Sequence, residues 1–146
     1  MKIEIDQSGH VEYTSHPTIV ADSLGHAVHI TTKTKKSILQ IYRLAGKPRV
    51  YVYETFSLLI AIVIRKTYAR ENLYIVDTEY SGKSDIIKNL TLKFLHKMNI
   101  PITPQQIDFG HVKQGSPSDA TAHTEFLKIN RAELVSLQKI LSLLLQ

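Results

Sequence analysis

Four carboxylates stand where expected strands and helices begin or end. Asp6 closes the first expected strand, and Asp77 directly follows the apolar run 73–76. Glu54 begins a long apolar segment, and Asp119 stands near the start of a late helix. Mg²⁺ and Mn²⁺ prefer hard carboxylate oxygens, and two such ions can activate water for phosphodiester cleavage. Acids gathered at one edge of a sheet would therefore suit metal-dependent cleavage of nucleic acid.

Each of these acids also has an ordinary structural interpretation. Asp6 could shape a hairpin turn, and Asp119 could cap a helix. Glu54 would be favoured by the helix dipole, because it stands in a first turn. Asp77 is the strongest candidate for a functional acid, because its strand has the pattern of a central one and open α/β sheets place working groups at such ends.

The segment Gly82-Lys83-Ser84 matches the second half of a phosphate-binding loop. The full motif needs another glycine five residues before Gly82, and Asp77 occupies that position. A carboxylate there would repel phosphate and lacks the backbone freedom of glycine. The sequence therefore disfavours a nucleotide-binding loop, although Lys83 could still meet a nucleic-acid phosphate or be a solvated loop lysine.

The composition is that of an ordinary globular domain with a basic surface. The chain has 146 residues, no cysteine and a formal net charge of +5. Basic proteins favour polyanionic partners, so nucleic acid is the expected partner. The N-terminus lacks the pattern of a signal peptide, and the apolar run 58–64 is much shorter than the roughly 20 residues of a membrane helix. We expect a soluble cytoplasmic protein without a membrane partner.

The expected elements place these acids at sheet edges. Ile3 and Ile5, and then Val11 and Tyr13, alternate with polar residues around the turn 7–9, which predicts a β-hairpin. Further strands are expected at 18–21, 26–31, 49–53, 73–77 and 107–112, and helices at 33–44, 54–68, 84–98, near Ser118 and at 131–146. The spacing of Asn130 and Glu133 suits a capping box for the last helix. The order predicts a single α/β domain over residues 1–146, with N-terminal antiparallel strands in a mixed central sheet covered by helices.

Taken together, this order resembles the ribonuclease H-like superfamily. Its members begin with a hairpin that bears an aspartate on the first strand, as Asp6 is placed in KIEIDQSGHVEY. They carry another aspartate at the end of the central fourth strand, matched by Asp77 in LYIVD. Glu54 is the nearest candidate for their helical glutamate. In FGHVKQGSPSDATAH, Asp119 or His123 follows a Gly-His loop, as the terminal acid does in the family.

The resemblance implies a divalent-metal-dependent nuclease. Asp6, Asp77 and Asp119 would bind Mg²⁺ or Mn²⁺, with Glu54 and His123 as further catalytic residues. His123 stands where the family has an aspartate, and some Holliday-junction resolvases look similar in accepting histidine there. The alternative is a non-catalytic ribonuclease H-like domain that binds nucleic acid or a protein partner.

Lysines near the expected helix starts are candidates for phosphate contacts. Lys33, Lys35 and Lys36 form a cluster before the first helix, while Lys83 and Lys113 lie in later loops. Two interpretations are open: these lysines contact the phosphates of a nucleic-acid backbone, or they are surface residues surrounded by solvent.

A leucine stripe marks the last expected helix. It comprises Leu134, Leu137, Leu141 and Leu144. The stripe predicts packing within the chain or a homodimer contact.

Overall fold

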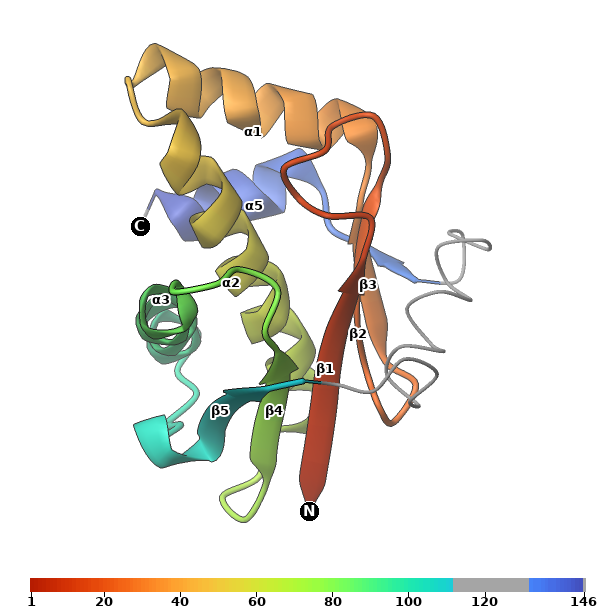
Figure 1. The fold of residues 1–146 in the computed structure, drawn as a ribbon, viewed down its shortest axis with the longest axis vertical. Helices are drawn as coiled ribbons and strands as arrows, with labels where there is room; N and C mark the ends of the chain where they lie inside the picture. Colours follow the sequence, from red (N-terminus) through yellow and green to blue (C-terminus); the bar gives the residue numbers. More distant parts are fainter. Residues whose placement is uncertain (112–131, 146) are drawn as a thin grey trace.

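A six-stranded sheet organises the residues that this computed structural model describes, 1–111 and 132–145 (Figure 1). The spatial order of its strands is β5-β4-β1-β2-β3-β6. Neighbours β1, β2 and β3 pair antiparallel, whereas β1 with β4, β4 with β5, and β3 with β6 pair parallel. The strands are β1 (Lys2–Ser8), β2 (Thr18–Asp22), β3 (Ala27–Ile30), β4 (Leu73–Asp77), β5 (Ile107–Gly110) and β6 (Glu133–Leu134). The prediction of an α/β fold with a mixed sheet is confirmed.

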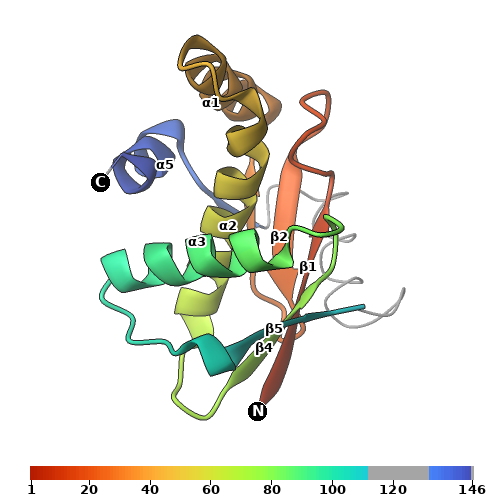
Figure 2. The same cartoon turned by 60° about the vertical axis from the view of Figure 1, so that its left-hand side comes forward.

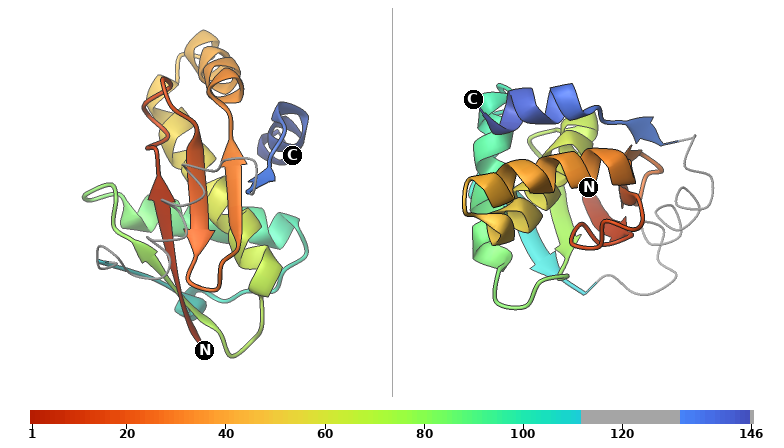
Figure 3. Two further views of the ribbon diagram at one scale, coloured as in Figure 1. Left: turned by 90° about the vertical axis from the view of Figure 1, so that its right-hand side faces the viewer. Right: turned by 90° about the horizontal axis from the view of Figure 1, so that it is seen from above.

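The helices gather on one face of this sheet (Figures 2 and 3). They are α1 (Thr32–Leu44), α2 (Pro48–Thr67), α3 (Ser84–Lys97) and α5 (Leu137–Leu144), with a short 3₁₀ helix η1 (Pro104–Gln106). Helix α2 lies between the strands and α3, and α1 lies beyond the end of β3 (Figure 1). Within the described ranges, no helix is both long enough and apolar enough to cross a membrane.

The hydrophobic core lies between the sheet and α2. Ile3 and Ile5 of β1 and Tyr74 and Val76 of β4 are fully buried. Every residue of α2 from 55 to 64 is buried, because the strands and α3 enclose this helix. The prediction of a helix that is buried nearly all round is confirmed.

The strand predicted at 49–53 is wrong, because these residues form the first turns of α2. Pro48 stands at the start of the helix, where its fixed φ is favourable. The alternation of valine and tyrosine imitates a strand, but Tyr51 is buried and its hydroxyl donates to the Val11 carbonyl oxygen at 2.9 Å. Tertiary packing here outweighs the strand preference of the residue types.

The predicted second strand around Val11 and Tyr13 is also wrong. Strand β1 pairs with β2 instead, and residues 9–17 form the loop between them. The Lys35 ammonium donates to the carbonyl oxygens of His10 at 3.1 Å, Tyr13 at 2.7 Å and His16 at 2.7 Å. A side chain thus satisfies backbone groups that would otherwise need a neighbouring strand.

The last helix begins later than predicted. Glu133 lies in β6 and forms an ion pair with Lys66 at 2.6 Å, so its expected role in a capping box is wrong. Ser136 caps α5 instead, because its hydroxyl accepts a hydrogen bond from the Lys139 N–H. Asn130 and the helix expected near Ser118 lie outside the described residues.

Candidate functional site

The parallel pairing of β1 and β4 brings Asp6 and Asp77 together. Ile5 lies opposite Val76 in the register, and the next residue on each strand is an aspartate. Ile5 and Val76 point into the core, so the alternation of a strand directs the two aspartates toward the opposite face. Asp77 ends β4, whereas Asp6 lies within β1, which continues to Ser8, so the prediction that Asp6 closes the first strand is wrong. Both carboxylates still lie in the C-terminal halves of adjacent parallel strands, near the edge where open α/β sheets commonly place their sites.

Glu79 is the third member of this acid cluster. Each of Asp6, Asp77 and Glu79 offers a carboxylate oxygen, and these oxygens lie within 4.8 Å of one another. Glu79 belongs to the segment that links β4 to α3. Glu79 is not among the acids predicted from the sequence, although its position two residues after Asp77 is a signal that could have indicated it.

The three carboxylates hold a proton when no cation is present. Burial, hydrogen bonds with Asp6 and Asp77, and the negative charges of both aspartates together raise the pKa of Glu79 to about 9. Like charges this close cannot all ionise without compensation. A divalent cation would provide that compensation, because carboxylates bind metal in their deprotonated form.

A network of polar and aromatic contacts fixes the segment that carries Glu79. The Gln7 amide donates to the Tyr80 hydroxyl at 3.2 Å, and that hydroxyl donates to Glu12 at 3.1 Å. The Tyr80 ring packs edge-on against Phe56, with 5.4 Å between ring centroids. Glu79 is therefore next to an anchored residue, which limits the positions that its carboxylate can take.

Small residues flank the two aspartates in the sheet. Ala21 lies opposite Asp6 on β2, and Gly110 lies opposite Asp77 on β5. Neither neighbour has a side chain long enough to cover a carboxylate. The adjacent positions in the sheet thus do not cover the two carboxylates, although Asp6 is buried by other parts of the chain and Asp77 only partly.

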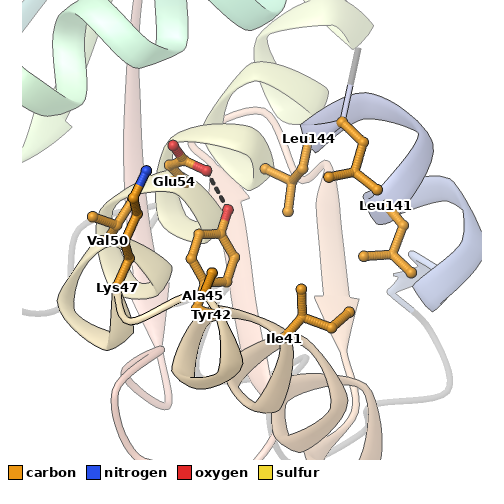
Figure 4. Close-up of a pocket in the computed structure, with 9 residues that line it drawn as sticks. Ile41, Tyr42, Ala45, Lys47, Val50, Glu54, Leu141 and Leu144 are labelled. Atoms are coloured by element: carbon orange, nitrogen blue, oxygen red, sulfur yellow. Dashed lines mark hydrogen bonds between the residues drawn. The ribbon is translucent and has the colours of Figure 1, made fainter.

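Glu54 is not part of the acid cluster, so its expected place beside Asp6 and Asp77 is wrong. It lies on α2, where its carboxylate accepts a hydrogen bond from the Tyr42 hydroxyl. It also lines a cavity between α1, α2 and α5 (Figure 4). Because α2 is apolar nearly all round, its periodicity did not show which way Glu54 points.

The lysines predicted to contact phosphate have different environments. Lys33 and Lys36 are exposed, whereas Lys35 is fully buried and bound to loop carbonyl groups, so its predicted phosphate contact is wrong. Burial lowers the pKa of Lys35 to about 8, which leaves it charged at neutral pH. The Lys83 ammonium lies 5.8 Å from the centre of the Tyr53 ring, a cation–π distance.

Three further candidates, Lys113, Asp119 and His123, lie outside the described residues. Comparison of the chain with family models, curated proteins and solved structures found no match. The site is therefore defined by its own geometry, a cluster of three acids near the carboxyl ends of two adjacent parallel strands.

Proposed function

We propose that the chain is a divalent-metal-dependent nuclease with a ribonuclease H-like fold. Asp6, Asp77 and Glu79 would hold Mg²⁺ or Mn²⁺. The observation that carries this proposal is the convergence of their three carboxylates within 4.8 Å, from two adjacent strands and the following segment. Mg²⁺ usually takes one or two protein carboxylates together with substrate phosphate, so this donor set fits the ion.

The residues of the cluster have distinct expected roles. Asp6 and Asp77 are fixed by the sheet, so they would set the position of the ion relative to a bound backbone. Glu79 would give up its proton when it becomes a ligand. When bound, the ion supplies Lewis-acid activation of water and neutralises charge on the scissile phosphate.

Two features support the ribonuclease H-like assignment. The first strand bears Asp6 and the fourth bears Asp77, as the resemblance implies, and the two strands are neighbours. The resemblance also implies a later ligand, which we propose to be Asp119 or His123.

The net charge of +5 and the exposed Lys33 and Lys36 support a nucleic-acid substrate.

Cleavage of labelled nucleic acids tests this proposal. Single-stranded, double-stranded and branched DNA, RNA and hybrid substrates are incubated with Mg²⁺ or Mn²⁺ and wild-type protein, Asp77→Asn or Asp108→Asn. Asp108 is an exposed acid on the neighbouring strand β5 and lies outside the cluster, so its variant is the matched control. We expect Asp77→Asn to lower metal-dependent cleavage at least about a hundredfold and Asp108→Asn to leave it unchanged.

Equal cleavage by wild type and Asp77→Asn would contradict the proposal. Binding of nucleic acid without cleavage, in the presence of bound metal, would identify the alternative, a non-catalytic binding domain. Metal binding is followed separately by calorimetry, so a lost ion and a lost activity are distinguished.

A further inference from the structure

A cavity of about 540 Å³ lies between α1, the start of α2 and α5. Its walls come from three helices, and most of its lining is aliphatic (Figure 4). Ile41 of α1 and Leu141 and Leu144 of α5 face it. This volume lies within the range of roughly 300–1,000 Å³ that is typical of small-molecule sites.

One carboxylate interrupts this apolar lining. Glu54 is half-buried in the wall of the cavity, and the Tyr42 hydroxyl donates a hydrogen bond to it (Figure 4). This hydrogen bond fixes the direction of the carboxylate. Among the described residues, no cation forms an ion pair with Glu54.

Lys47 is the charged side chain of opposite sign on the cavity lining. It is exposed, whereas Glu54 is half-buried, so the negative charge is the more enclosed of the two. A charge in a less solvated place interacts more strongly with a partner of opposite sign. The cavity thus combines an inner anion with an outer, solvated cation.

We propose that this cavity binds a small amphipathic cation, an ammonium group carrying an aliphatic or aromatic body. The head group would contact the Glu54 carboxylate beside the Tyr42 ring, since aromatic rings and carboxylates both attract ammonium ions. The apolar body would lie against Ile41, Leu141 and Leu144, which are otherwise only partly covered. Lys47 is the internal competitor of the ligand, because it is the cation of the chain that lines the same cavity.

This site is separate from the acid cluster. Glu54 is absent from the group formed by Asp6, Asp77 and Glu79. The helix that bears Glu54 packs on the face of the sheet opposite to that toward which the two aspartates are directed. Binding of an amphipathic cation should therefore be unchanged in the Asp77→Asn variant.

Three matched probes test the proposal: n-octylammonium, 1-octanol and octanoate, each below the concentration at which it aggregates. They share a chain length and differ in the charge of the head group. Affinity is measured by calorimetry, and the site by chemical-shift changes in amide NMR spectra. We expect octylammonium to bind most tightly and to shift resonances of α1, the first turns of α2, and α5.

Two substitutions examine the two charges of the cavity. Glu54→Gln keeps an oxygen that accepts the Tyr42 hydrogen bond but removes the charge, and it should weaken octylammonium binding about tenfold or more. Lys47→Met removes the competing cation and should strengthen octylammonium binding about two- to fivefold. Glu71→Gln changes an exposed acid in the turn between α2 and β4; it is the control and should have no effect.

Several results would overturn the proposal. Octanol binding as tightly as octylammonium would show that Glu54 does not recognise the head group. Tighter binding of octanoate, lost in Lys47→Met, would assign the cavity to an anion. Shifts that depend on protein concentration, and that the probes reverse by competition, would show that a second copy of the chain fills it. Because the Lys47 variant changes an exposed residue, it tests the proposal even if Glu54→Gln destabilises the fold.

Discussion

Replacing Glu79 with glutamine directly tests the shared proton of the acid cluster. The pKa of Glu79 rises from 4.5 to about 9 in the folded, metal-free protein. A raised folded-state pKa adds stability that is complete below the unfolded-state pKa and is lost as the pH rises through the folded-state pKa. The free energy of unfolding of the wild type should therefore fall between about pH 5 and about pH 9, and glutamine, which does not titrate, should remove this fall.

The size of the effect follows from the shift. Each pH unit within this window lowers the free energy of unfolding by at most about 1.4 kcal/mol. Between about pH 5 and about pH 7, the wild type therefore loses up to roughly 2.7 kcal/mol of unfolding free energy. The Glu79 side chain is only 13% exposed, so solvent screens its charge little. Because the three carboxylates share the proton, their titrations are coupled and the full shift is not realised by Glu79 alone. We therefore expect the unfolding free energy of the wild type to fall by about 1–2.5 kcal/mol over this interval, relative to Glu79→Gln. This corresponds to a change in melting temperature of roughly 3–8 °C for a chain of this length.

Thermal denaturation followed by circular dichroism measures this difference. Wild type, Glu79→Gln and the exposed control Glu71→Gln are compared in chelator at several pH values between about 5 and about 8. Because His10 Nδ1 lies 3.8 Å from the Glu79 carboxylate, His10 is replaced by asparagine in all three proteins, so that the differences report Glu79 alone. Relative to both of the others, Glu79→Gln should gain stability as the pH rises. Parallel profiles for wild type and Glu79→Gln would refute the shared proton.

Three other substitutions test the metal site, the buried lysine and a helix end. Mg²⁺ at about a hundred times its dissociation constant should raise the melting temperature of the wild type by roughly 8 °C in calorimetric scans, and that of Asp77→Asn by less than about 2 °C. Lys35→Met should lower the free energy of unfolding in urea by about 3 kcal/mol, because it leaves buried carbonyl groups without a donor, whereas the exposed neighbour in Lys36→Met should change it by less than about 0.5 kcal/mol. Gly46→Ala should cost about 1 kcal/mol in the same assay, because Gly46 has φ of 73° at the end of α1. An unchanged midpoint for either Lys35→Met or Gly46→Ala would contradict the role given to that residue.

The pair of strand aspartates could be predicted from the sequence. Asp77 ends a short apolar strand, and Asp6 follows the alternating residues Ile3 and Ile5 of β1; both strands exist in the fold. Their adjacency follows from the order of elements, since a strand that comes after a helix commonly returns parallel to an earlier one. The sheet brings together Asp77, the strongest candidate from the sequence, and Asp6, one of the other three acids that the sequence indicated.

Glu79 and Lys35 depend on contacts that no local pattern shows. The position of Glu79 is set by the packing of Tyr80 against Phe56, far away in the sequence. Lys35 looks like a solvated residue at a helix start, and only the return of the loop 9–17 encloses it. The sequence also did not show toward which part of the fold the Glu54 side chain points, because a helix that is buried on nearly all sides has no single polar face.

The hydrogen bonds from Lys35 to the loop 9–17 restrict the backbone of this loop more than its amino-acid sequence. The ammonium is held by backbone carbonyl oxygens, and every amino acid supplies one. The side chains of His10, Tyr13 and His16 are thus not specified by this interaction, although the course of the chain is. An exposed side chain such as Tyr13 can therefore vary while Lys35 keeps the course of the loop, whereas Val11 is buried and Glu12 accepts a hydrogen bond from Tyr80. In the proposed nuclease, such a position would allow the preference for a substrate to change without a change of fold.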